Sequence, residues 1–200
     1  MSQPITAKMV AELRARTGAG MMDCKAALQE SNGDIEAAVE ILRKKGIMKA
    51  EKRGGREVRE GLISSYIHHN GKVGVLVEVN CETDFVARTD DFKALVKSVA
   101  EHIAAMAPLA VDKDQIPADV IERERRIYVE EVKQSGKPAN LVDKIVDGKV
   151  EAFYKQNCLL SQPWVRDDKK TIGELVKEIS GKTGENVQVR RFTRFQMGEA

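Results

Sequence analysis

The sequence is poor in aromatic residues and in net charge. Aromatic residues make up 4% of the 200 positions, so any hydrophobic core must be mostly aliphatic. The 33 basic and 31 acidic side chains leave a formal charge of +2, too small for bulk attraction to nucleic acid or to a membrane. With 42% hydrophobic and 32% charged residues, the sequence is typical of a soluble globular chain of one or two domains.

Cysteines and long apolar runs are also scarce. Cys24, Cys81 and Cys158 are odd in number and far apart, which favours reduced thiols in a cytosol over a disulfide framework. No apolar run reaches the roughly 18 residues that a membrane-spanning helix requires. The first ten residues lack the apolar segment of a signal peptide. The sequence therefore predicts a cytoplasmic protein with no membrane partner.

Three short helices are expected at the N-terminus. Thr6 can cap the first helix, and the glycines of residues 17–20 end it. A second helix is predicted from about Met21 to Glu30. Asp34 is well placed to cap a third helix, in which apolar residues recur at helical spacing: Ile35, Val39 and Leu42.

A basic segment follows this three-helix region. Between residues 43 and 60, eight Lys and Arg residues accompany three Glu residues, and Gly54–Gly55 can act as a hinge. The segment is either a patch for a phosphate backbone or a solvated connector. The absence of interleaved aromatic residues favours the connector, because base stacking needs them. We therefore expect a basic linker over residues 47–60.

A β-hairpin is predicted around Asn70–Gly71. Two strand-like runs flank this dipeptide, which favours a two-residue type I′ turn and pairs His68 with Val73. Alternate residues of the second strand point to opposite faces of the sheet. One face is expected to be buried because it carries Val73, Val75, Val77, Val79 and Cys81.

Helices dominate the rest of the chain. One is predicted from Thr89 through an apolar stripe that begins at Phe92 and ends at Met106. Others are expected over about 117–134, from about 138, and from 171 to about 181, with residues 157–170 irregular and a last strand over 186–195. The predicted class is α+β, with a small antiparallel sheet packed with helices.

No pattern of residues indicates enzyme chemistry. A nucleophile with a base, a metal cluster and a phosphate cradle are all missing at recognisable spacings. His68 and His69 are adjacent in a strand, so they point to opposite faces and cannot share one ion there. We expect no catalytic residue, no metal ligand and no cofactor.

Two groups of apolar residues are candidates for a protein contact. Met21 and Met22 follow a glycine turn, where either both fill the small core, or one faces inward and the other is exposed as an adaptable contact surface. Phe85 lies in a connection after the hairpin. It either folds back beneath the sheet or anchors in a pocket on a partner, with Thr83 and Asp84 as polar neighbours.

Three segments resemble a known family. The runs ELRARTGAGMMDCKAAL, VEVNCETDFVAR and ENVQVRRFTRF are similar to those of translation elongation factor Ts, the guanine-nucleotide exchange factor of elongation factor Tu. The resemblance covers essentially the whole chain. It implies a three-helix, ubiquitin-associated-like module over residues 1–46 that binds the partner, the linker over 47–60, and an α+β dimerisation core over 61–200.

The resemblance also implies roles for individual residues. In the family, the element that matches Thr83, Asp84, Phe85 and Val86 enters the nucleotide-binding domain of elongation factor Tu and displaces the magnesium ion that helps to hold GDP. The N-terminal contact surface of the family carries over to Arg14, Met21 and Met22. For Phe85 the resemblance favours the partner anchor.

Chain length suggests an oligomer. Many family members carry a duplicated core half and a long helical hairpin, for which 200 residues leave no room. The chain resembles the short form, in which two identical chains supply what longer members carry in one, so a homodimer is expected.

Two other classes of function stay open: an RNA-binding adaptor built on the linker with Arg190, Arg191 and Arg194, and a ubiquitin-binding module.

Overall fold

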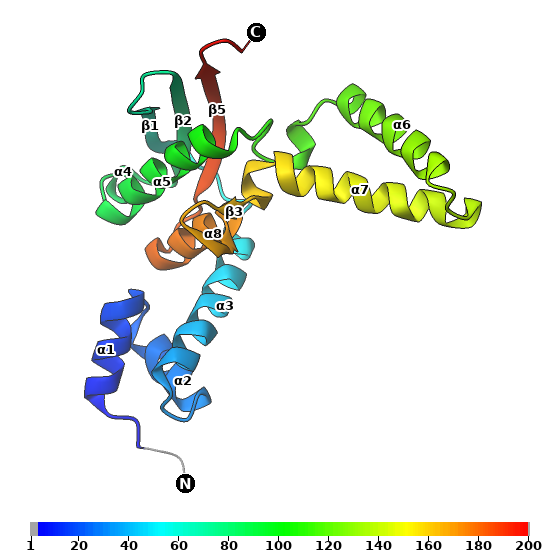
Figure 1. Ribbon diagram of the computed structural model, residues 1–200. Helices are drawn as coiled ribbons and strands as arrows, with labels where there is room; N and C mark the ends of the chain where they lie inside the picture. The colour runs from blue at the N-terminus through cyan, green and yellow to red at the C-terminus, as the bar shows by residue number, and fades with distance from the viewer. Residues whose placement is uncertain (1–3, 200) are drawn as a thin grey trace. The chain divides into compact units, whose positions relative to one another are not determined.

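The computed structural model describes residues 4–199 and has the predicted α+β class (Figure 1). Three N-terminal helices come first, and an antiparallel sheet packed with helices follows. The chain divides into two units, each assembled from distant parts of the sequence. The first unit contains the residues up to Gly61 with 80–95 and 174–188, and the second contains 62–79, 96–173 and the residues from Val189 onward.

The three N-terminal helices are α1 (Ala7–Thr17), α2 (Met21–Glu30) and α3 (Ile35–Arg53). The predicted caps at the starts of α1 and α3 are confirmed. The Thr6 hydroxyl accepts the Met9 N–H at 3.3 Å, and the Asp34 carboxylate accepts the Ala37 N–H at 3.0 Å. The three helices enclose an aliphatic core of Val10, Leu13, Cys24, Ala27, Leu28, Ala38 and Leu42.

Helix α3 is longer than the sequence suggests, because it continues through residues 47–53 of the expected linker. Lys, Glu, Ala and Met predominate there, and all of them favour helix, while Gly54 ends it. Six of the eight basic side chains in this region donate to acidic or carbonyl partners. These contacts are Arg43–Glu174, Lys45–Glu30, Lys49–Asp23, Arg56–Glu82 and Arg59–Glu57, together with Arg53 to the Ser180 carbonyl.

The main sheet has the strand order β1 (Glu60–Ile67), β2 (Val73–Cys81), β5 (Gln188–Gln196). The predicted buried face of β2 is confirmed, since Val75, Val77, Val79 and Cys81 are all buried, while Val73 at its start is only partly buried. The predicted pairing is also present, because the His68 N–H donates to the Val73 carbonyl at 2.9 Å. The predicted turn type is wrong: only Gly71 has positive φ, whereas a type I′ turn requires it at both central residues.

The second unit contains a helical hairpin. Figure 1 shows α6 (Ala118–Gln134) and α7 (Val142–Asn157) side by side and joined by a short turn. Val132, Val146 and Val150 form the buried contact between the two helices. The chain therefore contains a helical hairpin whose helices have 17 and 16 residues, and the expectation that it leaves no room for one is wrong.

The remaining elements are α4 (Asp84–Ala87), α5 (Asp90–Met106), α8 (Ile172–Thr183) and three short 3₁₀ turns over 113–115, 139–141 and 159–161. The segment predicted to be irregular contains a second small sheet, in which β3 (Pro163–Trp164) pairs with β4 (Asp167–Thr171). Its strands are very short, and β4 is mostly charged, so no alternating apolar pattern reveals it.

His102 lies in the core of the second unit and is fully buried. Its Nδ1 accepts the Val165 N–H at 3.2 Å, and its Nε2 lies 2.9 Å from the Gln162 amide oxygen, to which it donates. Burial lowers the pKa of His102 below its ordinary value. The ring is therefore a neutral structural group with both nitrogens bonded.

Candidate functional site

The predicted contact element forms a short helix after β2. Thr83 has extended backbone (φ −130°) and caps α4, because its hydroxyl accepts the Val86 N–H at 3.4 Å. Thr89 repeats this arrangement at the next helix, where its hydroxyl accepts the Phe92 N–H at 3.3 Å. Two capped helix starts six residues apart therefore define the backbone between β2 and α5.

Phe85 projects from this element into solvent. It is 79% exposed, whereas the next two residues, Val86 and Ala87, are 9% and 5% exposed. The interpretation in which Phe85 folds beneath the sheet is therefore wrong. A large apolar side chain that projects between the capping Thr83 and the buried pair of residues after it is suited to enter a pocket on another molecule. That role stays a prediction.

Asp84 begins α4 and is half exposed. Its carboxylate pairs with Arg88 one turn later at 2.7 Å. The Arg88 side chain is 75% exposed, so the pair contributes little to stability and can separate at low cost. The Asp84 charge is therefore available to a partner at the N-terminal end of the helix.

A carboxylate from a distant part of the sequence holds the start of this element. Glu185 lies between α8 and β5 and accepts three hydrogen bonds, from the N–H groups of Glu82 and Thr83 and from the Thr83 hydroxyl. Sequence reasoning did not assign a role to Glu185, although it begins the third of the three resembling segments. The separation of about a hundred residues concealed the contact.

Cys81 lies under the start of the same element. Its thiol is fully buried and donates to the Thr83 carbonyl at 3.2 Å. Burial, and then the nearby Glu185 charge, raise the pKa of the Cys81 thiol to about 11. The thiol is therefore protonated at neutral pH and acts as a packing group.

The N-terminal candidates lie at the start of α2 and on α1. Met21 and Met22 are 47% and 77% exposed, so the alternative in which both fill the small core is wrong. Cys24 takes the buried position instead, one turn into the helix. Arg14 is exposed on α1. These residues and the element at 83–86 belong to the same unit of the chain.

Within residues 4–199, no three His, Cys, Asp or Glu side chains gather closely enough to hold a metal ion. In the same range, no helix is both long and apolar enough to cross a membrane.

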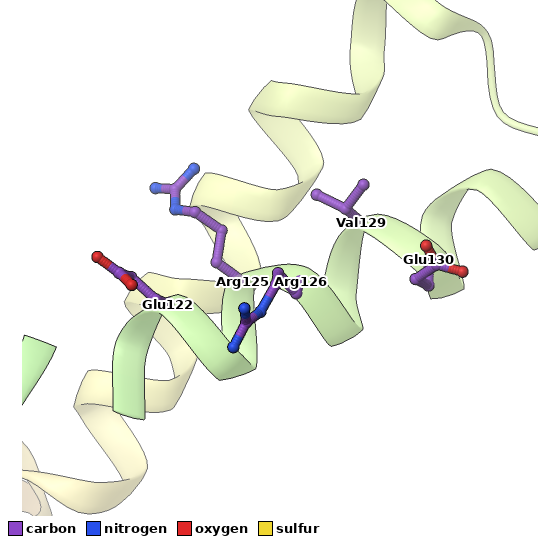
Figure 2. Close-up of a pocket in the computed structure, with 5 residues that line it drawn as sticks. All are labelled: Glu122, Arg125, Arg126, Val129 and Glu130. Carbon is purple, nitrogen blue, oxygen red and sulfur yellow. The ribbon is translucent and has the colours of Figure 1, made fainter. Parts of the chain in front are cut away.

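A hollow of about 470 Å³ lies along α6, where Figure 2 shows the side chains that line it: Glu122, Arg125, Arg126, Val129 and Glu130. It contains none of the candidate site residues.

Exposed apolar side chains at two capped or glycine-bounded helix starts are features of a protein that acts through contact with another protein. A family model described as elongation factor Ts matches residues 7–199. Elongation factor Ts of Fervidobacterium nodosum is 61% identical over 195 residues, which cover 98% of this chain and 99% of that protein. Those of Thermosipho melanesiensis and Thermotoga maritima are each 53% identical over 98% of this chain, and 100% and 97% of their lengths are covered.

The chain therefore belongs to the elongation factor Ts family. Members of this family are nucleotide exchange factors for elongation factor Tu and are not enzymes.

Proposed function

We propose that this chain accelerates GDP release from elongation factor Tu by inserting residues 83–86 and displacing the bound magnesium ion. The observation that carries the proposal is the 79% exposure of Phe85 beside two buried neighbours. The Thr83 cap and the buried Val86 and Ala87 already fix the backbone that carries Phe85, so little backbone freedom is lost when this side chain binds. Insertion therefore costs little conformational entropy, and most of the free energy of the new contacts is left to open the nucleotide site.

The mechanism needs no covalent step. A factor that binds nucleotide-free elongation factor Tu more tightly than the GDP-bound form weakens GDP binding by the same ratio. Phe85 supplies the apolar contact made only after insertion, and Asp84 brings a negative charge close to the magnesium shell. Thr83 and Val86 hold the two ends of the insert.

The N-terminal helices provide a second contact. Met21 and Met22 are exposed, flexible and apolar, and Arg14 adds a positive charge on the neighbouring helix. We assign residues 1–46 to partner binding, 47–60 to the basic linker and 61–200 to the dimerisation core. A contact outside the nucleotide site raises affinity without competing with the insert.

We also propose a homodimer formed through the outer face of the main sheet. Since His68 pairs with Val73, Ser65 lies opposite Leu76, which puts Ile63 and Ile67 on the face that carries Leu76. Arg191 pairs with Glu78 on this face at 2.7 Å. Phe195 follows at the same alternation, whereas Arg194 points to the other side and donates to the Ala104 carbonyl of α5.

The four apolar side chains of this face are strongly exposed: Ile63 by 64%, Ile67 by 65%, Leu76 by 50% and Phe195 by 71%. An apolar patch spread over three strands favours a protein contact. A second copy of the same face is the simplest partner, since most soluble oligomers are symmetric.

The RNA-binding alternative is less well supported. No aromatic residue for base stacking lies among the basic side chains between residues 43 and 59, and six of these side chains already contact acidic groups or a carbonyl. We therefore expect no direct nucleic-acid partner. RNA binding with a steep dependence on salt concentration would contradict this expectation. Because the proposed partner acts in translation, we place the chain in the cytoplasm.

Release of a fluorescent GDP from purified elongation factor Tu tests the proposal. We expect the release rate to rise with the concentration of this protein and to saturate, with no nucleotide hydrolysis by the protein itself. A rate that stays at the intrinsic value at saturating concentrations would remove the proposed function.

A further inference from the structure

We infer that Glu185 is a positioning residue of the exchange reaction, which orders the contact element before the partner binds. The inference rests on the proposed function of residues 83–86. Glu185 itself lies in the turn between α8 and β5, away from the inserted side chains in sequence. It acts by fixing the backbone from which Asp84 and Phe85 project.

The geometry uses both oxygens of one carboxylate. Oε2 accepts the Glu82 N–H at 3.1 Å and the Thr83 N–H at 3.0 Å, and Oε1 accepts the Thr83 hydroxyl at 2.6 Å. Hydrogen bonds to a charged acceptor are shorter and stronger than neutral ones. Three of them from two adjacent residues fix both the position and the direction of the chain as it leaves β2.

The Thr83 hydroxyl carries this order into the helix. It donates its one hydrogen to Glu185 and accepts the Val86 N–H with a lone pair, so both of its functions are used. The helix cap of α4 therefore has its orientation set by the Glu185 carboxylate. Phe85, placed between Thr83 and Val86, takes its direction from this chain of contacts.

Glu185 is itself held in place by its neighbours in the same unit. Asn186 is 3% exposed, its N–H donates to a Glu82 carboxylate oxygen at 2.6 Å, and its side-chain amide donates to the Arg56 carbonyl at 2.8 Å. The Ser180 hydroxyl donates to the Glu185 carbonyl. The carboxylate is therefore a fixed support and not a mobile surface group.

Loss of this support has a specific kinetic consequence. A contact element that is not ordered in the free protein must be ordered when the partner binds, which weakens binding. Once bound, the element makes the same contacts as before, so the maximal rate changes less. Glu185 variants should therefore raise the half-saturating concentration more than they lower the maximal release rate.

The test compares Glu185→Ala, Glu185→Gln and wild type in the release of fluorescent GDP from elongation factor Tu. Glu51→Gln is the matched control, because the Glu51 carboxylate pairs with Lys177 at 2.7 Å in the same unit and contacts no part of the element. We expect Glu185→Ala to raise the half-saturating concentration at least about tenfold, because it removes three hydrogen bonds to the carboxylate and the loss of even one is worth about that factor. Glu185→Gln should rescue part of this loss, since an amide oxygen still accepts N–H groups. Glu51→Gln should match wild type.

Hydrogen exchange supplies the second measurement. The Glu82 and Thr83 amides should exchange faster in both Glu185 variants, while amides in the buried part of α5 keep wild-type protection. Wild-type half-saturation in Glu185→Ala, or unchanged protection at both amides, overturns the inference. If Glu185→Ala does not fold, the Gln variant decides by the same two criteria. A wild-type protein that fails to accelerate release removes the proposed function, and the exchange rates of the two amides still test the positioning.

Discussion

Phe85→Ala separates an exposed anchor from a core side chain. Full burial of a phenylalanine is worth about 1.5 to 3 kcal/mol, and Phe85 retains 79% of its exposure. The folded chain therefore gains only about 0.5 kcal/mol from this side chain, so Phe85→Ala should unfold at nearly the wild-type denaturant concentration. Phe92 is the matched control because it is 0% exposed in the following helix. Phe92→Ala should cost about 3 to 5 kcal/mol.

The assay pairs urea unfolding with GDP release for wild type and both variants. We expect Phe85→Ala to lower the maximal release rate by at least about tenfold, because an anchoring aromatic side chain is typically worth 2 kcal/mol or more. Unfolding of Phe85→Ala far below wild type would refute the exposed position. A wild-type release rate in a stable Phe85→Ala protein would refute the anchor.

Four further outcomes are expected. Asp84→Ala should slow GDP release with a stability change below about 0.5 kcal/mol, because its ion pair is exposed; unchanged release contradicts a role for the charge. Leu76→Asp should give a monomer by light scattering at micromolar concentration, since an unpaired charge is costly to bury, and a persistent dimer would argue against the outer sheet face. Burial lowers the pKa of His102 below its unfolded-state value of about 6.5, so the free energy of unfolding should be highest above about pH 6.5 and decline as the pH falls from there to the folded-state pKa. Urea unfolding at pH 7.5 and 5.5 checks this, and His102→Gln should give a flatter pH profile. Gly148→Ala should stabilise the chain by about 0.5 to 1 kcal/mol in urea unfolding, because an added Cβ inside α7 meets no atom within 4 Å; destabilisation would contradict that geometry.

Local signals predicted much of the fold. The caps at Thr6 and Asp34 depend on side chains within three residues of their targets, and the valine alternation of β2 depends only on strand geometry. The turn at Asn70 was mispredicted because an Asn-Gly pair tolerates several turn types, and the wider loop here needs positive φ at Gly71 alone. Strands β3 and β4 escaped prediction because their pairing is tertiary and not patterned.

The candidate site was predictable only where its features depend on residues adjacent in the sequence. A phenylalanine beside a capping threonine can be read from adjacent residues, but its exposure depends on which neighbours are buried. Glu185 could not be linked to Thr83, because no spacing rule connects residues about a hundred positions apart. Tertiary hydrogen bonds of this kind are visible only when the strands and turns that carry them are placed in three dimensions.

The three cysteines offer a way to observe separate parts of the chain opening. Cys24 lies in the core of the N-terminal helices, Cys81 beneath the contact element, and Cys158 in a cluster with Ala110 and Ile116. All three are buried free thiols, and burial raises the pKa of Cys81 and Cys158 to about 11. An alkylating reagent can therefore reach each thiol only after its own surroundings open. The rate at which each cysteine is modified therefore reports how often its own part of the chain opens. Modification of Cys81 ahead of the other two would identify the contact element as the first part to open.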